Sequence, residues 1–172
     1  NAIHYENMSI ALAESVANAG QGFISSMAFG NGGTSVDPTG IITYLTPNST
    51  GTNASLYNQT FTKIVDDRSV SNLDPQRNKI ETRHVNGTNY TDVVVTCLLD
   101  YGEPNGQDAT DTASASDSLY VFDELGLTSY ASSGTGKLLT HVIFHPVQKS
   151  LNRLIQIDYT VRVQSLTGFN EG

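Results

Sequence analysis

Apolar and polar residues alternate most regularly near the C-terminal end of the chain. Side chains on one face of residues 153–163 are Arg153, Ile155, Ile157, Tyr159, Val161 and Val163, and those on the other are Leu154, Gln156, Asp158, Thr160 and Arg162. Successive side chains of a β-strand point to opposite faces of the sheet. The alternation therefore predicts a strand with one mostly apolar and one mostly polar face, as in an antiparallel sheet that has one side in water.

Shorter segments with strand character are spaced along the rest of the chain. They cover residues 23–29, 41–45, 79–85, 119–127 and 138–144, and in 79–85 the residues Ile80, Thr82 and His84 share one face. Residues 93–99 form a nearly unbroken apolar run, which predicts a strand buried on both faces and places Cys97 in the core. Residues 57–65 fit either a helix or a strand, and residues 46–56 have the composition of an exposed loop. Turn-forming residues separate these segments, at 30–33, 37–40 and 132–136.

One segment fits a helix, at residues 5–19. Its apolar residues recur at steps of three and four, which predicts one apolar face made of Tyr5, Met8, Leu12, Val16 and Ala19. Asn7 is a candidate cap for its start, and Gly20 and Gly22 suit its end. We expect this helix to close one end of the chain's own sheets, with docking on a neighbouring subunit as the alternative.

These elements predict a mainly β protein. The expected fold is an antiparallel β-sandwich or barrel of seven to eight short strands with one N-terminal α-helix at about residues 5–19. No internal repeat and no break in composition indicates a second unit. Residues 1–172 are therefore expected to form a single β-rich domain.

Charge and cysteine content narrow the classes of function. The 172 residues carry nine Lys and Arg against 17 Asp and Glu, a net charge of −8. Binding to nucleic acid or to an anionic membrane depends on clustered basic residues, so neither partner is expected. No apolar run approaches the roughly 20 residues of a membrane-spanning helix. The single cysteine, Cys97, excludes an intrachain disulfide and a Cys-based zinc cluster.

Histidines are the first candidates for a metal or catalytic site. His141 and His145 lie four residues apart, which in a strand puts them on one face but about 13 Å apart, too far to bind one ion. We interpret them as structural histidines, with a site on a symmetry axis between several chains as the alternative. His4 and His84 have no companion ligands in the sequence. No metal and no cofactor is therefore predicted.

Carboxylates are the second class of candidates. They are Asp92, Asp100, Glu103, Asp108, Asp111, Asp117, Asp123 and Glu124. A glycosidase needs two of them on either side of a sugar, but no pair stands out and the chain has no Trp for a sugar platform. The polar stretch 101–117 is longer than most loops and lacks the spacing of a calcium loop. We expect it to be a solvated loop.

Other short motifs in the sequence do not indicate a binding or catalytic site. Gly134-Thr135-Gly136-Lys137-Leu138 has Ala131 and Leu138 where a phosphate loop needs Gly and Ser or Thr. The sequence has no Gly-x-Ser-x-Gly motif for a serine nucleophile. Glycosylation sequons begin at Asn7, Asn48, Asn53, Asn58, Asn86 and Asn89, as expected by chance in a chain this rich in Asn, Ser and Thr. No catalytic, cofactor-binding or metal-binding residue is predicted.

Three segments carry a resemblance to a known class of proteins. They are residues 23–34 with the turn at 37–40, residues 56–60, and residues 120–127 followed by 138–144. In this order they resemble the tail-fibre and baseplate-attachment domains of tailed bacteriophages, whose strand Phe-x-Ile-x-Glu-Ile-Gly-Leu is similar to residues 120–127. The whole chain is also similar to conserved structural proteins of T4-like cyanophages. Residues 101–117 and 146–150 depart from the tail-fibre pattern.

This resemblance implies a non-enzymatic structural subunit of a tailed-phage virion. Such a subunit is expected to be an adaptor or accessory protein of the tail, baseplate or neck. Its partners are other virion proteins and copies of itself, and it is located in the virion after assembly in the host bacterial cytoplasm. Alternatives are a decoration (cement) protein of the capsid exterior, a host-glycan-binding module that uses some of the eight Tyr and six Phe, and a virion glycanase.

Overall fold

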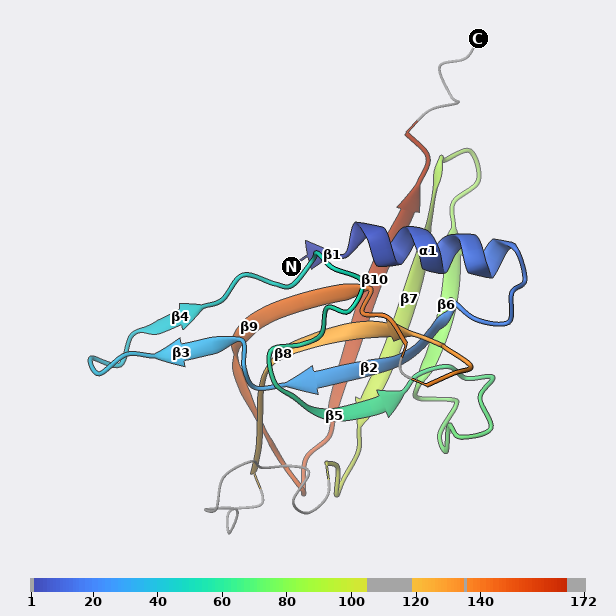
Figure 1. The fold of residues 1–172 in the computed structure, drawn as a ribbon. Helices are drawn as coiled ribbons and strands as arrows, with labels where there is room; N and C mark the ends of the chain where they lie inside the picture. Colours follow the sequence, from blue (N-terminus) through green and yellow to red (C-terminus); the bar gives the residue numbers. More distant parts are fainter. Residues whose placement is uncertain (1, 105–118, 135, 167–172) are drawn as a thin grey trace.

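The protein is mainly β. The computed structural model describes residues 2–104, 119–134 and 136–166, and within them it has one helix and ten strands in three antiparallel sheets (Figure 1). The elements are β1 (Ala2–Ile3), α1 (Tyr5–Val16), β2 (Ile24–Gly30), β3 (Thr34–Val36), β4 (Ile42–Tyr44), β5 (Gln59–Ile64), β6 (Lys79–His84), β7 (Tyr90–Leu99), β8 (Leu119–Ser129), β9 (Thr140–Ser150) and β10 (Ile155–Gln164). Most of the predicted loop at 101–117 lies outside the described residues.

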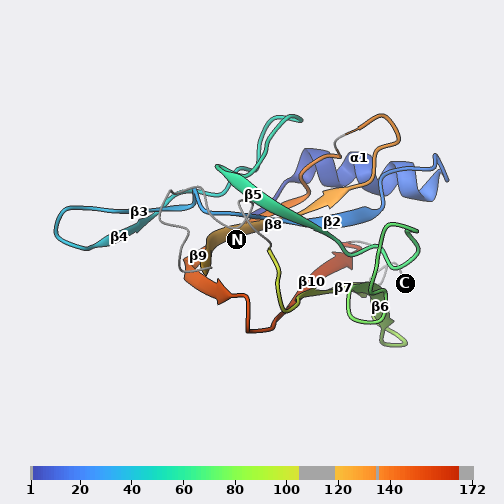
Figure 2. The same ribbon diagram turned by 90° about the horizontal axis from the view of Figure 1, so that it is seen from below.

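Two sheets pack into a β-sandwich-like fold, which confirms the predicted class. A five-stranded sheet has the order β1-β9-β8-β2-β5, and a three-stranded sheet has the order β10-β7-β6. Their strands cross steeply, as Figures 1 and 2 show. The core between them consists of Met27, Phe29, Val65, Val95, Cys97, Leu99, Tyr120, Phe122, Leu125, Leu127 and Val161.

The strands with the strongest sequence patterns form as predicted. In β7, Val95, Cys97 and Leu99 face the core, while Val94 and Leu98 are also buried on the other face. Burial raises the pKa of Cys97 to about 12, as expected of a thiol that packs as a small hydrophobic residue. The alternation predicted for residues 153–163 is present in β10, whose apolar face packs on this core. The ambiguous segment 57–65 contains a strand, β5.

The number of strands exceeds the seven to eight expected. The sequence gives no signal for β1 and β3, which have only two and three residues. So few residues cannot show an alternation, because the pattern that predicts a half-buried strand needs about four to eight positions. Both strands are defined by their partners: β1 pairs with β9, and β3 pairs with β4.

The helix is shorter than predicted and begins differently. It ends at Val16, with Ala17 as its C-terminal cap, instead of continuing to residue 19. Asn18 then adopts a left-handed backbone conformation with φ of 53°, which stops the helix before the glycines that were expected to end it. The N-terminal cap is His4, whose Nδ1 accepts a hydrogen bond from the N–H of Asn7. Asn7 itself lies one turn inside the helix.

Only part of the predicted apolar face of the helix points inward, since Met8 packs against the core. Tyr5 and Val16, which were expected to face the core, are 77% and 87% exposed. The buried residues of α1 are Asn7 and Ala11. The Asn7 side chain donates a 2.9 Å hydrogen bond to the carbonyl of Leu138, and this polar contact turns the neighbouring face of the helix inward. The spacing of apolar residues cannot predict this buried face, because the hydrogen bond of the Asn7 side-chain amide orients the helix.

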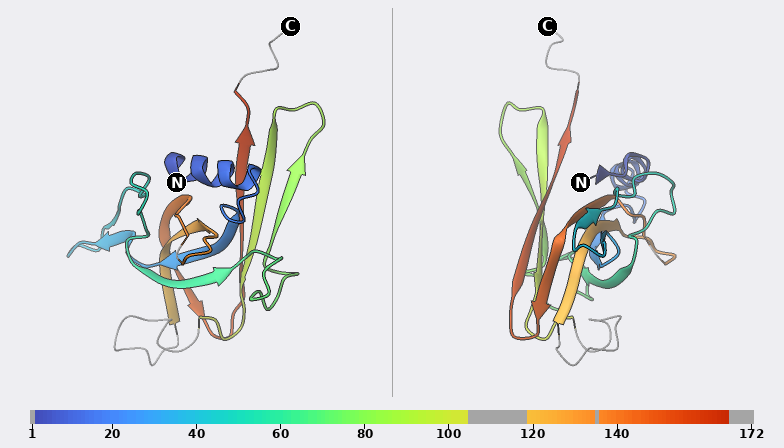
Figure 3. Two further views of the ribbon diagram at one scale, coloured as in Figure 1. Left: turned by 45° about the vertical axis from the view of Figure 1, so that its right-hand side comes forward. Right: turned by 90° about the vertical axis from the view of Figure 1, so that its left-hand side faces the viewer.

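Two parts of the fold project from the sandwich. On one side, β3 and β4 form a separate two-stranded hairpin that extends away from both sheets (Figures 1 and 2). We call residues 33–45 the arm. On the other side, the ends of β6, β7 and β10 extend past α1, as both views in Figure 3 show.

Candidate functional site

Two consecutive carboxylates, Asp123 and Glu124, are buried inside β8. A buried charge is strongly destabilising unless other groups donate hydrogen bonds to it. Both side chains therefore need several donors, which they find in the glycine-rich turn and the loop next to it. We call these two residues the carboxylate anchor.

Asp123 holds the start of the arm. Its Oδ1 accepts a hydrogen bond from the N–H of Gly33 at 2.8 Å. Its Oδ2 accepts bonds from the N–H and the hydroxyl of Thr34, at 2.9 and 2.5 Å. Because a carboxylate that accepts several short bonds fixes its donors, the first residues of β3 have a defined position against β8.

Glu124 joins the glycine-rich turn to the loop that returns from the arm. Its Oε2 accepts hydrogen bonds from the N–H groups of Gly32 and Asn58, both at 2.9 Å. Its Oε1 accepts bonds from the N–H of Tyr57 at 2.9 Å and from His141 Nε2 at 2.8 Å. Burial alone would raise the pKa of the Glu124 carboxyl, but the bonds from His141 and the three backbone N–H groups outweigh it and hold the pKa below its usual value.

The hydrogen bonds also define the state of two buried histidines. His141 Nδ1 accepts a 2.7 Å bond from the N–H of Asn48, so the ring proton is on Nε2, which donates to Glu124. His4 has the same arrangement, since its Nδ1 accepts from Asn7 and its Nε2 donates to the carbonyl of Gly51 at 2.7 Å. Both rings act as neutral imidazoles that hold the loop of residues 45–58.

Glycines allow the turn to approach the carboxylates this closely. A Cβ added at Gly30 would lie 2.4 Å from the carbonyl oxygen of Asn58, and one at Gly32 would lie 2.8 Å from the Cβ of Tyr57. Neither φ is positive, so the requirement here is space and not a left-handed backbone. The glycine run predicted as a turn is therefore also a close-packed contact between β2, β8 and the returning loop.

The arm that this anchor positions has an apolar surface. Val36 and Ile41, on either side of its tip, are 64% and 62% exposed, and Tyr44 and Leu45 are also exposed. The tip itself is well ordered by Asp37, whose Oδ1 accepts bonds from Thr39 and from the N–H of Ile41. A two-stranded hairpin that does not pack on a third strand or a helix is marginally stable in water. Within the described residues, the arm therefore presents exposed apolar side chains from a rigid base.

A second exposed apolar surface lies between α1 and the three-stranded sheet. It is a groove of about 500 Å³. The helix contributes Met8, Ala11 and Leu12, the sheet contributes Ile80, Thr82, Val93, Val161 and Val163, and residues 66–68 lie at the rim. Because Asn7 and Ala11 bring one face of α1 against the sandwich, the rest of the helix stands apart from the projecting ends of the strands. We call this space the groove.

The opposite face of the three-stranded sheet is polar. Arg162 makes a two-point ion pair with Asp92, at 2.9 and 3.2 Å, and Glu81 pairs with Lys79 and Arg83. The guanidinium carbon of Arg162 also lies 3.8 Å from the centre of the Tyr90 ring. One face of the Tyr90 ring is therefore covered by a cation.

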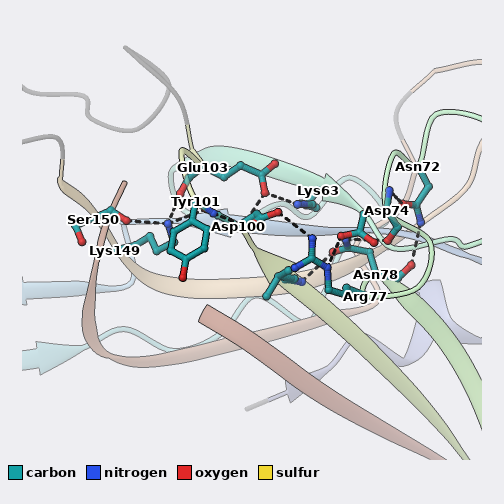
Figure 4. Close-up of polar contacts among 11 residues, drawn as sticks. Lys63, Asn72, Asp74, Arg77, Asn78, Asp100, Tyr101, Glu103, Lys149 and Ser150 are labelled. Carbon is teal, nitrogen blue, oxygen red and sulfur yellow. Dashed lines mark hydrogen bonds and ion pairs between the residues drawn. The ribbon is translucent and has the colours of Figure 1, made fainter. Parts of the chain in front are cut away.

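Asp100 and Glu103, two of the carboxylates considered for sugar chemistry, lie in a structural cluster next to β9 (Figure 4). Glu103 forms an ion pair with Lys63, and Asp100 pairs with Arg77 at 3.2 Å. Lys149 is buried, and burial lowers its pKa.

Lys149 joins two stretches of backbone through three carbonyl groups. Its Nζ donates to the carbonyls of Asp100, Glu103 and Ser150 at 3.0, 2.7 and 2.8 Å. Figure 4 shows these carbonyls converging on the one ammonium group. The cluster therefore fastens the end of β9 to the segment that follows β7, and its carboxylates are engaged in ion pairs.

The remaining predicted candidates are dispersed. His141 is buried, whereas His145 is exposed because it lies in a bulge, where the three residues between Ile143 and Val147 oppose Asp123 alone. Val142 and Phe144, which alternate with the two histidines, pack on the core, and the hydrogen bonds of His141 and His145 have no partner in common. His84 is exposed and bonds to its neighbours at Tyr90 and Thr91. Asp108, Asp111, Asp117 and Thr135 lie outside the described residues.

The carboxylate anchor is the feature that sequence reasoning missed. Asp123 and Glu124 were counted among eight carboxylates with nothing to distinguish them. The available signal was their position, since two adjacent acids interrupt the apolar run of residues 120–127. Adjacent charges in a strand of this kind require buried donors, and the glycine run at 30–33 is a suitable source because glycines let backbone N–H groups approach closely.

Comparison with protein-family models, with curated proteins and with solved structures finds no match for this chain. Among the described residues, no helix has the length and apolar character needed to cross a membrane. The same part of the chain holds no group of three or more His, Cys, Asp or Glu side chains arranged to bind a metal ion. Any function proposed for this chain must therefore be argued from its sequence and from the geometry of the arm, the carboxylate anchor and the groove.

Proposed function

We propose that this chain is a structural subunit that works through protein–protein contacts and not through catalysis. Following the resemblance in its sequence, we place it in the virion of a tailed phage, as an adaptor or accessory protein of the tail, baseplate or neck. The observation that carries the proposal is the arm, which has a rigid polar base and exposes the apolar side chains of Val36, Ile41 and Tyr44. Its partners are other virion proteins and copies of the same chain.

The contrast between the base and the tip of the arm supports this role. The base is fixed by five backbone N–H groups that donate to Asp123 and Glu124. The residues that flank its turn, Val36 and Ile41, are exposed to solvent. Fixing the base lowers the entropy lost when the tip binds, and exposed apolar side chains gain free energy when another protein covers them. A projecting element of this kind is suited to binding a neighbouring subunit.

The buried polar groups support the same interpretation. Glu124 and His141 resemble a catalytic pair in chemistry, but both are completely buried and their hydrogen-bonding positions are taken by Gly32, Tyr57, Asn58 and Asn48. A general acid or base needs to reach its substrate directly or through one water molecule. These groups are therefore better suited to holding the fold.

The glycan-binding alternative has less support than assembly. Tyr5, Tyr44 and Tyr101 are exposed, but the chain has no Trp, and Arg162 covers one face of the Tyr90 ring. A capsid-decoration protein would use the same kind of apolar contact as a tail adaptor, so the arm suits both. The resemblance to tail-fibre and baseplate-attachment domains is the reason to prefer the tail.

The composition of phage particles tests this proposal. Particles are purified from a lysate that contains this chain, washed in high salt, and analysed by quantitative mass spectrometry, with an abundant host protein as the measure of trapping. A fixed number of copies per particle is expected. The proposal is contradicted if the chain stays in the particle-free fraction, and release of reducing sugar from host polysaccharide by the purified protein would favour the glycanase alternative.

A further inference from the structure

We propose that β6 of one copy pairs antiparallel with β6 of a second copy of this chain, about a twofold axis at Thr82. The two three-stranded sheets then join edge to edge. This inference rests on the proposed function and specifies one of its contacts. The partner is a second copy of the chain, held by its backbone and by the charges of the strand.

Unpaired backbone groups lie along one side of β6. The strand pairs with β7 on its other side, and within the described residues no strand pairs with this one. Figure 3 shows β6 along the outer border of the molecule, with the β6–β7 hairpin standing clear of α1. The free N–H and C=O groups of an edge strand are matched by those of another extended strand. The geometry therefore selects a strand as the partner of this edge.

The two faces of β6 differ in chemistry. Ile80 and Thr82 line the groove, whereas Lys79, Glu81 and Arg83 lie on the polar face of the sheet. The polar face therefore carries positive, negative and positive charges in turn along the strand. In an antiparallel pair, residues directly opposite one another interact, and opposite charges there stabilise the pair whereas like charges destabilise it. The charge pattern of β6 thus decides in which register two copies can meet.

One register brings only opposite charges together. With Thr82 on the twofold axis, Glu81 of each copy lies opposite Arg83 of the other, which gives two attractive pairs. Every other centre from residue 79 to residue 83 places like charges opposite one another, for example the two copies of Glu81, or Arg83 and Arg77. Charges on an edge strand commonly prevent pairing with other strands. Here they exclude the wrong registers and leave one that is self-complementary.

The charges of β6 are available to a second copy. The side chains of Glu81 and Arg83 are 42% and 68% exposed, and their own ion pair is 3.5 Å long. A charge-assisted hydrogen bond is typically about 2.7–2.9 Å long, so this pair is loosely held. The other edge of the sheet, β10, differs because its Arg162 is turned inward to Asp92 and Tyr90. We therefore assign the contact to β6.

The size and symmetry of the contact predict how the dimer behaves. A stable interface of standard size uses about 20–30 residues from each partner. β6 has only six residues, so the isolated dimer is expected to be weak and to form only at high protein concentration. Because both copies use the same strand, the contact is isologous and closes after two copies. In a particle, contacts made by other parts of the chain raise the effective concentration of the two edges.

Charge-reversal variants of the full chain test the pairing by sedimentation velocity over a concentration series. Arg83→Glu and Glu81→Arg each place like charges opposite one another in the dimer. Asp158→Arg is the matched control, because Asp158 is exposed on the same polar face but lies in β10. Circular dichroism of all three variants should match that of the wild type. The two β6 variants should each dimerise at least roughly tenfold more weakly than the wild type, whereas the control should dimerise normally.

Mixing the two β6 variants tests the register. In the mixed pair, the Glu81→Arg chain has only positive charges at positions 81 and 83, and the Arg83→Glu chain has only negative ones. Both opposite pairs are then attractive, so an equimolar mixture should form a one-to-one dimer although neither variant dimerises alone. Recovery of the dimer also shows that both variants are folded.

Three results would overturn the inference. A wild type that is monomeric at every concentration would leave this edge to a strand of another virion protein. A mixture that stays monomeric while the wild type dimerises would place the contact in another register or on another surface. Loss of the dimer in Asp158→Arg would move the contact to the β10 edge. None of these results changes the particle-composition test of the proposed function.

Discussion

Replacing Glu124 with glutamine is the most direct perturbation of the carboxylate anchor. Glutamine has nearly the same shape as glutamate, but one carboxylate oxygen becomes an NH₂ group. In the native protein, the Oε1 of Glu124 accepts two hydrogen bonds and Oε2 accepts two more. Whichever end carries the nitrogen, two N–H donors then face another donor in a buried site.

His141 cannot relieve this conflict. If its ring shifted the proton from Nε2 to Nδ1, Nε2 would become an acceptor for the new amide, but Nδ1–H would then face the N–H of Asn48. Each buried donor left without an acceptor costs about 1–3 kcal/mol. Two of them give a loss of about 2–6 kcal/mol in the free energy of unfolding, against a typical total of about 5–15 kcal/mol.

Urea denaturation followed by far-ultraviolet circular dichroism measures this loss. With a slope of roughly 2 kcal/mol per molar urea, the midpoint of Glu124→Gln should fall by about 1–3 M. Glu81→Gln is the matched control, because the Glu81 side chain is half-exposed on the polar face, where it pairs with Lys79 and Arg83. Its midpoint should equal that of the wild type. A Glu124→Gln midpoint equal to the wild type would refute the role given to the anchor.

Further predictions concern pH, the buried thiol, the buried lysine and the glycine turn. Because the folded pKa of Glu124 is lowered, its stabilising effect is present above its ordinary value of 4.5 and disappears as pH falls through the folded pKa, so the difference between wild type and Glu124→Gln should shrink in acid denaturation series below that value. Cys97, with a pKa raised to about 12, should not react with a thiol reagent in the native protein and should release one equivalent in urea. Lys149→Met leaves three backbone carbonyls without their donor and should cost about 2–5 kcal/mol in urea denaturation, and near-native stability would contradict this. Gly32→Ala places a Cβ 2.8 Å from that of Tyr57, and overpacking of this kind should lower stability by about 1–3 kcal/mol in the same assay.

The strands with long regular patterns could be predicted from the sequence because their packing follows simple rules. β10 alternates between the core and solvent, so the period of its side chains appears directly in the order of residues. The run at 93–99 lies in β7, the central strand of its sheet, and has buried residues on both faces, Val95, Cys97 and Leu99 on one and Val94 and Leu98 on the other. The burial of Cys97 in the core was predicted by the same reasoning. In each case the environment of a residue depends mostly on its own strand.

The helix face and the anchor could not be predicted because they depend on partners far away in the sequence. Asn7 is buried by a bond to Leu138, 131 residues away, which no periodicity within α1 reveals. Glu124 is satisfied by groups near residues 32, 58 and 141, which come together only after the five-stranded sheet and its neighbouring loops have formed. The alternation of apolar and polar residues also does not predict the arm, because the apolar side chains of the arm do not pack on the core. These long-range polar contacts are the part of the fold that distinguishes this chain from a generic sandwich.

A cryo-electron-microscopy reconstruction of the assembled protein would show what surrounds the arm. We expect density for residues 33–45 covered by a neighbouring protein chain, with Val36 and Ile41 in contact with that neighbour and the Asp123–Glu124 anchor unchanged. Assembled particles in which the arm remains surrounded by solvent would contradict it.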